Sequence, residues 1–122
     1  MTSRLHHVAL GAADVDRVAI FYRDVLGLPE LRRQHDADGL RSVWLDLGDA
    51  TLMVERSRES ARPVDAIGRG PFLIALRMAA ADRTGLEARL EAAGAAIESR
   101  TEFTSYARDP EGNRVAVSCF PA

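Results

Sequence analysis

Two histidines stand side by side in the segment LHHVAL, which otherwise reads as a short apolar strand. An imidazole can bind a metal ion or transfer a proton near neutral pH. Because successive side chains of a strand point to opposite faces, we predict that His6 and His7 lie on opposite sides of a sheet. Only one of them would then contribute to a given site.

Two further segments carry side chains that could line the same site. TLMVER places Met53 and Glu55 on one face of a predicted strand. In SVWLDL, alternation puts Trp44 on the side opposite the apolar Val43 and Leu45. An indole wall suits a flat ligand, although a tryptophan in the core is equally common.

The elements that position these residues follow the order β-α-β-β-β. RLHHVALGA is a strand candidate, and DVDRVAIFYRDVLGL has apolar residues at helical spacing. Asp14 or Asp16 can cap that helix and Gly27 can end it. A run of β-favouring segments over residues 30–56 follows, broken at Gly39 and at GDA as hairpin turns would break it.

After a polar linker over residues 57–70, the same order begins again. PFLIALRM predicts a strand, and DRTGLEARLEAAG predicts a helix that ends at Gly94. AAIESRTEF and TSYARDPEGNRVAVSCF supply further strands, with a turn at DPEGN.

The two halves look like a duplication. At a constant offset His7 matches Leu73, and Ala9 matches Ala75. A duplicated βαβββ module explains this economically and predicts an α+β fold. We predict one domain over residues 1–122, with module one at about 4–56, the linker at about 57–70 and module two at about 71–121.

The composition limits the classes of function. The chain has 122 residues, 47% of them hydrophobic, and a formal charge of −2, which gives no electrostatic reason to expect nucleic acid or a membrane as a partner. The lone Cys119 forms no internal disulfide, and its parity predicts a small buried hydrophobe facing the helices. The N-terminus lacks the apolar region of a signal peptide, and no apolar run reaches the ~18 residues of a spanning helix. We therefore expect a cytoplasmic protein.

LHHVAL and DVDRVAIFYRDVLGL, with YARDPEGNRVAV near the C-terminus, resemble the vicinal oxygen chelate superfamily. This superfamily includes glyoxalase I, fosfomycin-resistance thiol transferases, extradiol dioxygenases, methylmalonyl-CoA epimerase and bleomycin-resistance binding proteins. The resemblance covers nearly the whole chain. It implies two modules whose sheets form a cup with helices on the convex side, and a homodimer that often shares each cup between subunits. It does not name the reaction, because one scaffold hosts many chemistries.

The resemblance also implies where a metal ion would bind. Metal-dependent members use the first and fourth strands of each module, and these positions fall on His7, Glu55, Leu73 and Ala116. Leu73 and Ala116 have no metal-binding atoms, whereas even a catalytic zinc site usually keeps three protein ligands. A manganese, nickel, zinc, iron or magnesium ion would thus have an incomplete site. The harder Mg²⁺ and Mn²⁺ can be held by few side chains when substrate oxygens complete the octahedron.

His7 and Glu55 also have interpretations that need no metal. They could form a hydrogen-bonded polar pair on the floor of the cup. Alternatively, Glu55 could act as a general base, or His7 as the group that transfers a proton.

Other residues could shape the cup without binding a metal. Arg77 shares the parity of Leu73 and could offer its guanidinium to a carboxylate or phosphate, or it could be an exposed strand end. The facing of Tyr106 is not fixed by the sequence. The predicted ligand-contacting residues are Trp44, Met53, Leu73, Arg77, Tyr106, Ala116 and Ser118.

Three functions are compatible with this pattern. The first is a metal-free binding protein of the bleomycin-resistance kind, which the apolar second half favours because such a cup suits an amphipathic organic ligand. The second is a metal-assisted lyase, isomerase or dioxygenase of glyoxalase type. The third is a metal-independent lyase or isomerase that uses Glu55 or His7.

Overall fold

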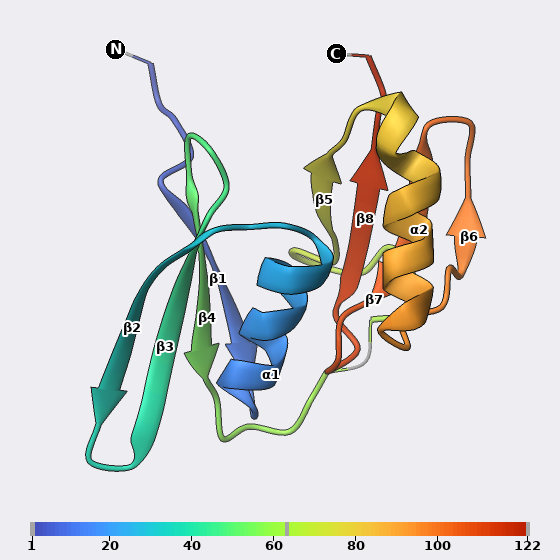
Figure 1. Cartoon of the computed structure of the whole chain (residues 1–122). Helices are drawn as coiled ribbons and strands as arrows, with labels where there is room; N and C mark the ends of the chain where they lie inside the picture. Colours follow the sequence, from blue (N-terminus) through green and yellow to red (C-terminus); the bar gives the residue numbers. More distant parts are fainter. Residues whose placement is uncertain (1, 63, 122) are drawn as a thin grey trace. The chain divides into compact units, whose positions relative to one another are not determined.

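The chain divides between Ser60 and Ala61 into two compact units, each with one four-stranded sheet. The structure is a computed structural model that describes residues 2–62 and 64–121 (Figure 1). Each unit follows the order strand, helix, three strands, so the predicted pair of βαβββ modules and the α+β class are confirmed.

The first unit contains four strands and one helical segment of two parts. These are β1 (His7–Ala12), α1 (Val15–Ile20), the π-helix η1 (Phe21–Val25), β2 (Glu30–Asp36), β3 (Gly39–Asp46) and β4 (Thr51–Arg56). The strand order is β1-β4-β3-β2, with β1 parallel to β4 and the other pairs antiparallel. The crossover from β1 to β4 contains the helix and the β2–β3 hairpin.

Alternating apolar residues build the core of the first unit on one side of its sheet. Val43 and Leu45 on β3, and Leu52 and Val54 on β4, have no exposed surface. The helical segment covers this side, and Tyr22 is likewise fully buried. The opposite side of the sheet carries the other alternation and is therefore free to hold polar and aromatic side chains.

The predicted helix within residues 14–28 forms over Val15–Val25, and its winding changes along the way. Asp14 caps it as predicted, because its carboxylate accepts a hydrogen bond from the backbone N–H of Arg17 at 3.1 Å. From Phe21 onward the helix continues as a π turn, in which the N–H of Leu26 bonds to the carbonyl of Phe21. Gly27, at φ 77°, follows the end of this turn.

The second unit repeats the pattern with shorter strands. Its elements are β5 (Ile74–Arg77), the 3-10 helix η2 (Ala80–Asp82), α2 (Arg83–Ala92), β6 (Ser99–Arg100), β7 (Thr104–Arg108) and β8 (Arg114–Ser118). The strand order β5-β8-β7-β6 matches that of the first unit. DPEGN forms the predicted turn between β7 and β8, where the Asp109 carboxylate accepts hydrogen bonds from the backbone N–H groups of Glu111 and Asn113.

Three sequence expectations in the second half are corrected. The strand predicted over PFLIALRM is only β5, because its ladder with β8 begins at Ile74 and leaves Leu73 outside. The strand predicted over AAIESRTEF is only the two residues of β6. Cys119 is half-buried and lies beyond the end of β8, where its thiol contacts the carbonyl oxygen of Phe103 at 3.5 Å.

The segment that contains the predicted linker has neither helix nor strand over residues 57–62 and 64–73. Within the described ranges, no helix is long and apolar enough to cross a membrane.

Candidate functional site

The candidate site of the first unit is the sheet face that points away from α1. Alternation places Trp44 on this face of β3, and Met53 and Glu55 on this face of β4, because their neighbours Leu45 and Leu52 are fully buried on the other. Trp44, Met53 and Glu55 are each half-buried. The predicted facing of all three residues is therefore correct.

Trp44 is held in place from two sides. Its indole N–H donates a hydrogen bond to the hydroxyl oxygen of Ser42 at 2.9 Å, and Ser42 itself is 1% exposed. The guanidinium carbon of Arg32, on the neighbouring strand β2, lies 4.8 Å from the centre of the indole ring. A ring fixed in this way offers a preorganised surface, because little side-chain entropy remains to be lost on binding.

His7 and Glu55 do not form the hydrogen-bonded pair that was one of the alternatives for these residues. In the parallel ladder of β1 and β4, His7 is opposite Thr51, whereas Glu55 is opposite Gly11. Four residues of strand therefore separate the two side chains, or about 13 Å at the usual rise per residue. One metal ion could not be bound by both side chains from this arrangement.

The strand pairing also corrects which residue of β4 stands at the metal position of the first unit. Ala9 is opposite Met53 in the first unit, and the matching Ala75 is opposite Ala116 in the second. The counterpart of Ala116 is thus Met53, and Glu55 lies two residues further along its strand.

The side chains at these four positions do not fit the divalent ion that metal-dependent members of the superfamily bind. The four positions are occupied by His7, Met53, Leu73 and Ala116. His7 alone offers an imidazole, and the thioether of Met53 is a poor partner for a hard divalent ion. Within residues 2–62 and 64–121, no group of three or more His, Cys, Asp or Glu side chains could hold a metal.

The two adjacent histidines also depart from the prediction. His7 is the first residue of β1, and His6 precedes the strand, although its carbonyl accepts a hydrogen bond from the backbone N–H of Thr51 at 3.1 Å. Their Nδ1 atoms lie 2.9 Å apart, and the rings meet edge to face with centroids 5.1 Å apart. Both side chains are exposed.

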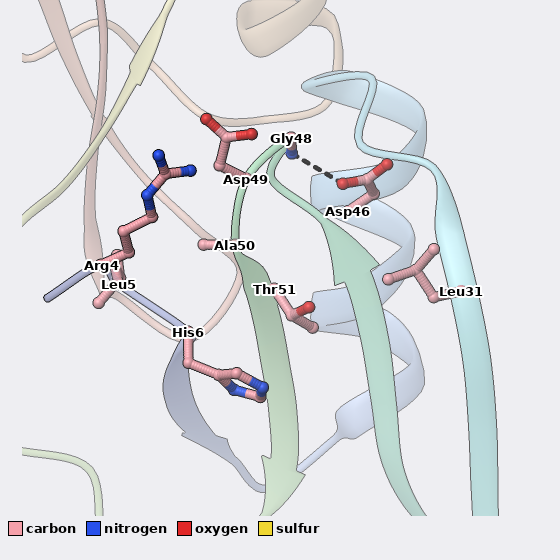
Figure 2. Close-up of a pocket in the computed structure, with 9 residues that line it drawn as sticks. All are labelled: Arg4, Leu5, His6, Leu31, Asp46, Gly48, Asp49, Ala50 and Thr51. Atoms are coloured by element: carbon pink, nitrogen blue, oxygen red, sulfur yellow. Dashed lines mark hydrogen bonds between the residues drawn. The ribbon is translucent and has the colours of Figure 1, made fainter. Parts of the chain in front are cut away.

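A pocket of about 420 Å³ lies at the end of this face where β3 turns into β4 (Figure 2). Asp46 and Thr51 form a ladder pair at its edge, and Arg4 and His6 approach from the segment before β1. The residues that line it are Arg4, Leu5, His6, Leu31, Asp46, Gly48, Asp49, Ala50 and Thr51. The sequence did not predict this pocket. The one signal for it was that Asp46 lies two residues after Trp44 and therefore shares its face of β3.

In the second unit, the strand pairing shows which residues lie on the corresponding face of the sheet. Tyr106 is opposite Ala116, which settles its facing, and the guanidinium carbon of Arg114 lies 5.5 Å from its ring centre. The hydroxyl of Ser118 is hydrogen-bonded to that of Thr104 at 2.7 Å. Arg77, opposite Ser118, is exposed. Tyr106 is thus the counterpart of Trp44, since each pairs with the residue at the equivalent fourth-strand position.

Comparison with protein families gives one match, a glyoxalase-like domain over residues 7–118. The chain belongs to this family. This glyoxalase-like protein is accordingly a member of the vicinal oxygen chelate superfamily, as the sequence predicted. No curated protein sequence matches it.

Several solved structures resemble this glyoxalase-like protein. Lactoylglutathione lyase from Agrobacterium tumefaciens is 26% identical, with a TM-score of 0.69 over 96% of this chain and 93% of that one. TioX from Micromonospora sp. ML1 is 25% identical, with a TM-score of 0.69 over 95% of this chain and 98% of that one. A mutant of the fosfomycin resistance protein FosX from Listeria monocytogenes, complexed with Mn(II) and a dihydroxypropylphosphonic acid, is 14% identical. Its TM-score is 0.81 over 99% of this chain and 95% of that one, which establishes the shared fold.

Proposed function

We propose that this protein binds an amphipathic organic ligand against the sheet face of its first unit that points away from α1, without a complete metal site. The observation that carries the proposal is the continuity between an aromatic surface and a pocket. The ladder pair of Asp46 and Thr51 borders the pocket, and the next pair on the same face is Trp44 and Met53. The two ladder pairs are about 7 Å apart along the strands, which is within the length of a small organic molecule.

The two ends of this surface differ in polarity. Met53 and the indole of Trp44 offer apolar contact, whereas Arg4, His6 and Asp49 bring charge or hydrogen-bonding groups to the pocket. Apolar walls with a few convergent polar groups are typical of small-molecule sites. The remaining predicted contacts, Leu73, Arg77, Tyr106, Ala116 and Ser118, belong to the corresponding part of the second unit, to which we extend the proposal.

Trp44 makes the proposal measurable, because it is the single tryptophan of the chain. The probe is 1-anilinonaphthalene-8-sulfonate, an amphipathic aromatic anion that accepts excitation energy from tryptophan. We expect saturable energy transfer from Trp44 that is unchanged by EDTA. Met53→Ala should weaken probe binding about tenfold, because a lost apolar contact of this size is worth about 1.4 kcal/mol.

Ile20→Ala is the matched control for this titration. Ile20 is an aliphatic residue of α1, 38% exposed, on the other side of the sheet, and its truncation should change the probe's dissociation constant less than twofold. Equal effects of the two substitutions, or loss of probe binding in EDTA, would contradict the proposal.

The alternative function is a divalent-metal-assisted lyase, isomerase or dioxygenase of glyoxalase type that uses His7 and Glu55. The 26% identity with a lactoylglutathione lyase supports it. The register of β1 and β4 counts against it, because the two side chains cannot meet at one ion. An assay for EDTA-sensitive lactoylglutathione lyase activity tests it, and we expect no activity above the uncatalysed rate.

A further inference from the structure

The imidazole rings of His6 and His7 contact each other at the start of β1. Their Nδ1 atoms are 2.9 Å apart, and the ring planes are nearly perpendicular at 84°. In the metal-free protein one Nδ1 carries the proton and donates it to the other. If both rings hold their proton on Nε2 instead, each Nδ1 offers a lone pair, and the two nitrogens lie 2.9 Å apart.

The separation of the two nitrogens is short enough for one ion to replace the shared proton. Two nitrogens ~2.05 Å from one ion lie about 2.9 Å apart when they subtend a right angle, and about 3.3 Å apart at the tetrahedral angle. The 2.9 Å between the two nitrogens is the length of a hydrogen bond, and it is also compatible with two adjacent ligands of one ion. Right-angled nitrogen ligands are typical of square-planar or tetragonal Cu²⁺ and Ni²⁺.

We propose that His6 and His7 form a two-nitrogen chelate for Cu²⁺ or Ni²⁺, with water in the remaining positions. Both side chains are exposed, so an ion reaches them without any rearrangement of the core. Of the two ions Cu²⁺ binds more tightly, because nitrogen ligands follow the usual order of divalent metals.

This site differs from the one that the resemblance implies. His6 is at none of the four positions discussed above, and both nitrogens of the chelate belong to the first unit. His6 also lines the pocket of about 420 Å³, so an ion at this place could present its open positions to a ligand held there.

Cu²⁺ titration of the full-length chain without a histidine tag tests the proposal, followed by calorimetry and by electron paramagnetic resonance in a non-coordinating buffer. We expect one ion per chain and coupling to two nitrogens. His6→Ala and His7→Ala should each weaken binding at least tenfold and reduce the coupling to one nitrogen. His35→Ala is the matched control, because His35 is an exposed histidine of β2, and it should bind as the unmodified chain does.

The variants also distinguish this chelate from other sites. Loss of binding in His7→Ala with full binding in His6→Ala would overturn the proposal, because a site that uses His7 with other residues would behave in that way. Unchanged binding in both variants would overturn it as well. Because both histidines are exposed, the thermal unfolding of the metal-free variants should match that of the unmodified chain, which verifies that they are folded.

Discussion

At the scale of single residues, Glu87 links the helix of the second unit to two of its strands. Its carboxylate on α2 accepts hydrogen bonds from Nε and Nη2 of Arg100 at 2.9 and 3.0 Å. It also accepts one at 2.5 Å from the hydroxyl of Ser105, which is 1% exposed. The hydrogen bonds from Arg100, and then that from Ser105, lower the pKa of Glu87 below its ordinary value of 4.5. The ionised carboxylate is thus the form that stabilises the fold.

We predict that Glu87→Gln destabilises the protein at pH 7 by about 1–3 kcal/mol, because charge-assisted hydrogen bonds are lost. Since the folded pKa is lowered, the stabilisation is present above the unfolded pKa and is lost as the pH falls through the folded value. Urea unfolding of wild type and variant at several pH values should therefore give a difference that shrinks below about pH 4.5. Glu91→Gln, at an exposed position of the same helix, is the control and should change stability by less than ~0.5 kcal/mol. A difference that is constant with pH would contradict this account.

At the scale of elements, two glycines at α2 have opposite roles. Gly85 lies inside the helix, with open space where a methyl group on its Cα would lie, and its φ is that of an ordinary helical residue. Gly94 lies just after the helix at φ +84°, where its N–H bonds to the carbonyl of Glu91 and closes the last turn. The first glycine costs helix stability, whereas the second supplies a backbone conformation that other residues rarely adopt.

We predict opposite effects for the same substitution at these two positions. Gly85→Ala should raise the free energy of unfolding by about 0.5–1 kcal/mol, because alanine restricts the unfolded chain and favours the helix. Gly94→Ala should lower it by about 1 kcal/mol or more, because the left-handed conformation strains an alanine. Beyond its chain neighbours and the backbone of the helix itself, neither methyl group would meet a heavy atom within 4 Å, so tertiary packing does not contribute. Thermal unfolding measures both effects, and shifts in the same direction would refute the assignment of roles.

At the scale of the whole molecule, the chain consists of two units that repeat one topology with different surfaces. Trp44 and Tyr106 occupy equivalent ladder positions, and each has an arginine against its ring. The fourth-strand positions opposite them hold Met53 in one unit and Ala116 in the other. Each unit thus has an aromatic side chain at this position, while His7 is the one imidazole or carboxylate among the four metal positions.

The homodimer implied by the resemblance stays a prediction. Light scattering of the protein at micromolar concentration should give twice the 13.3 kDa mass of one chain. A mass of one chain over the same range would show that each chain builds its ligand site alone. The assignments of residues to sheet faces within each unit would be unaffected by that result, because they follow from the strand ladders.

Much of the fold could be predicted because it depends on local patterns. Alternation in β3 correctly separated Trp44, on the face that points away from α1, from its fully buried neighbours Val43 and Leu45. Asp14 and Gly94 marked helix ends because capping and positive φ are properties of single residues. The repeat of the βαβββ order followed from the same kind of evidence.

The candidate site could be predicted only in part, because pairing between strands is not a local property. Sequence alone determined which face Met53 and Glu55 share, but not which residue of β1 lies opposite each of them. The register decided that Glu55 is four residues away from the partner position of His7 and that Met53 is the counterpart of Ala116. The structure also places His6 just before β1, with its Nδ1 2.9 Å from that of His7, a contact that alternation along a strand did not predict. Tertiary structure was needed for these points because backbone hydrogen bonds between distant segments fix the register, and no single segment encodes them.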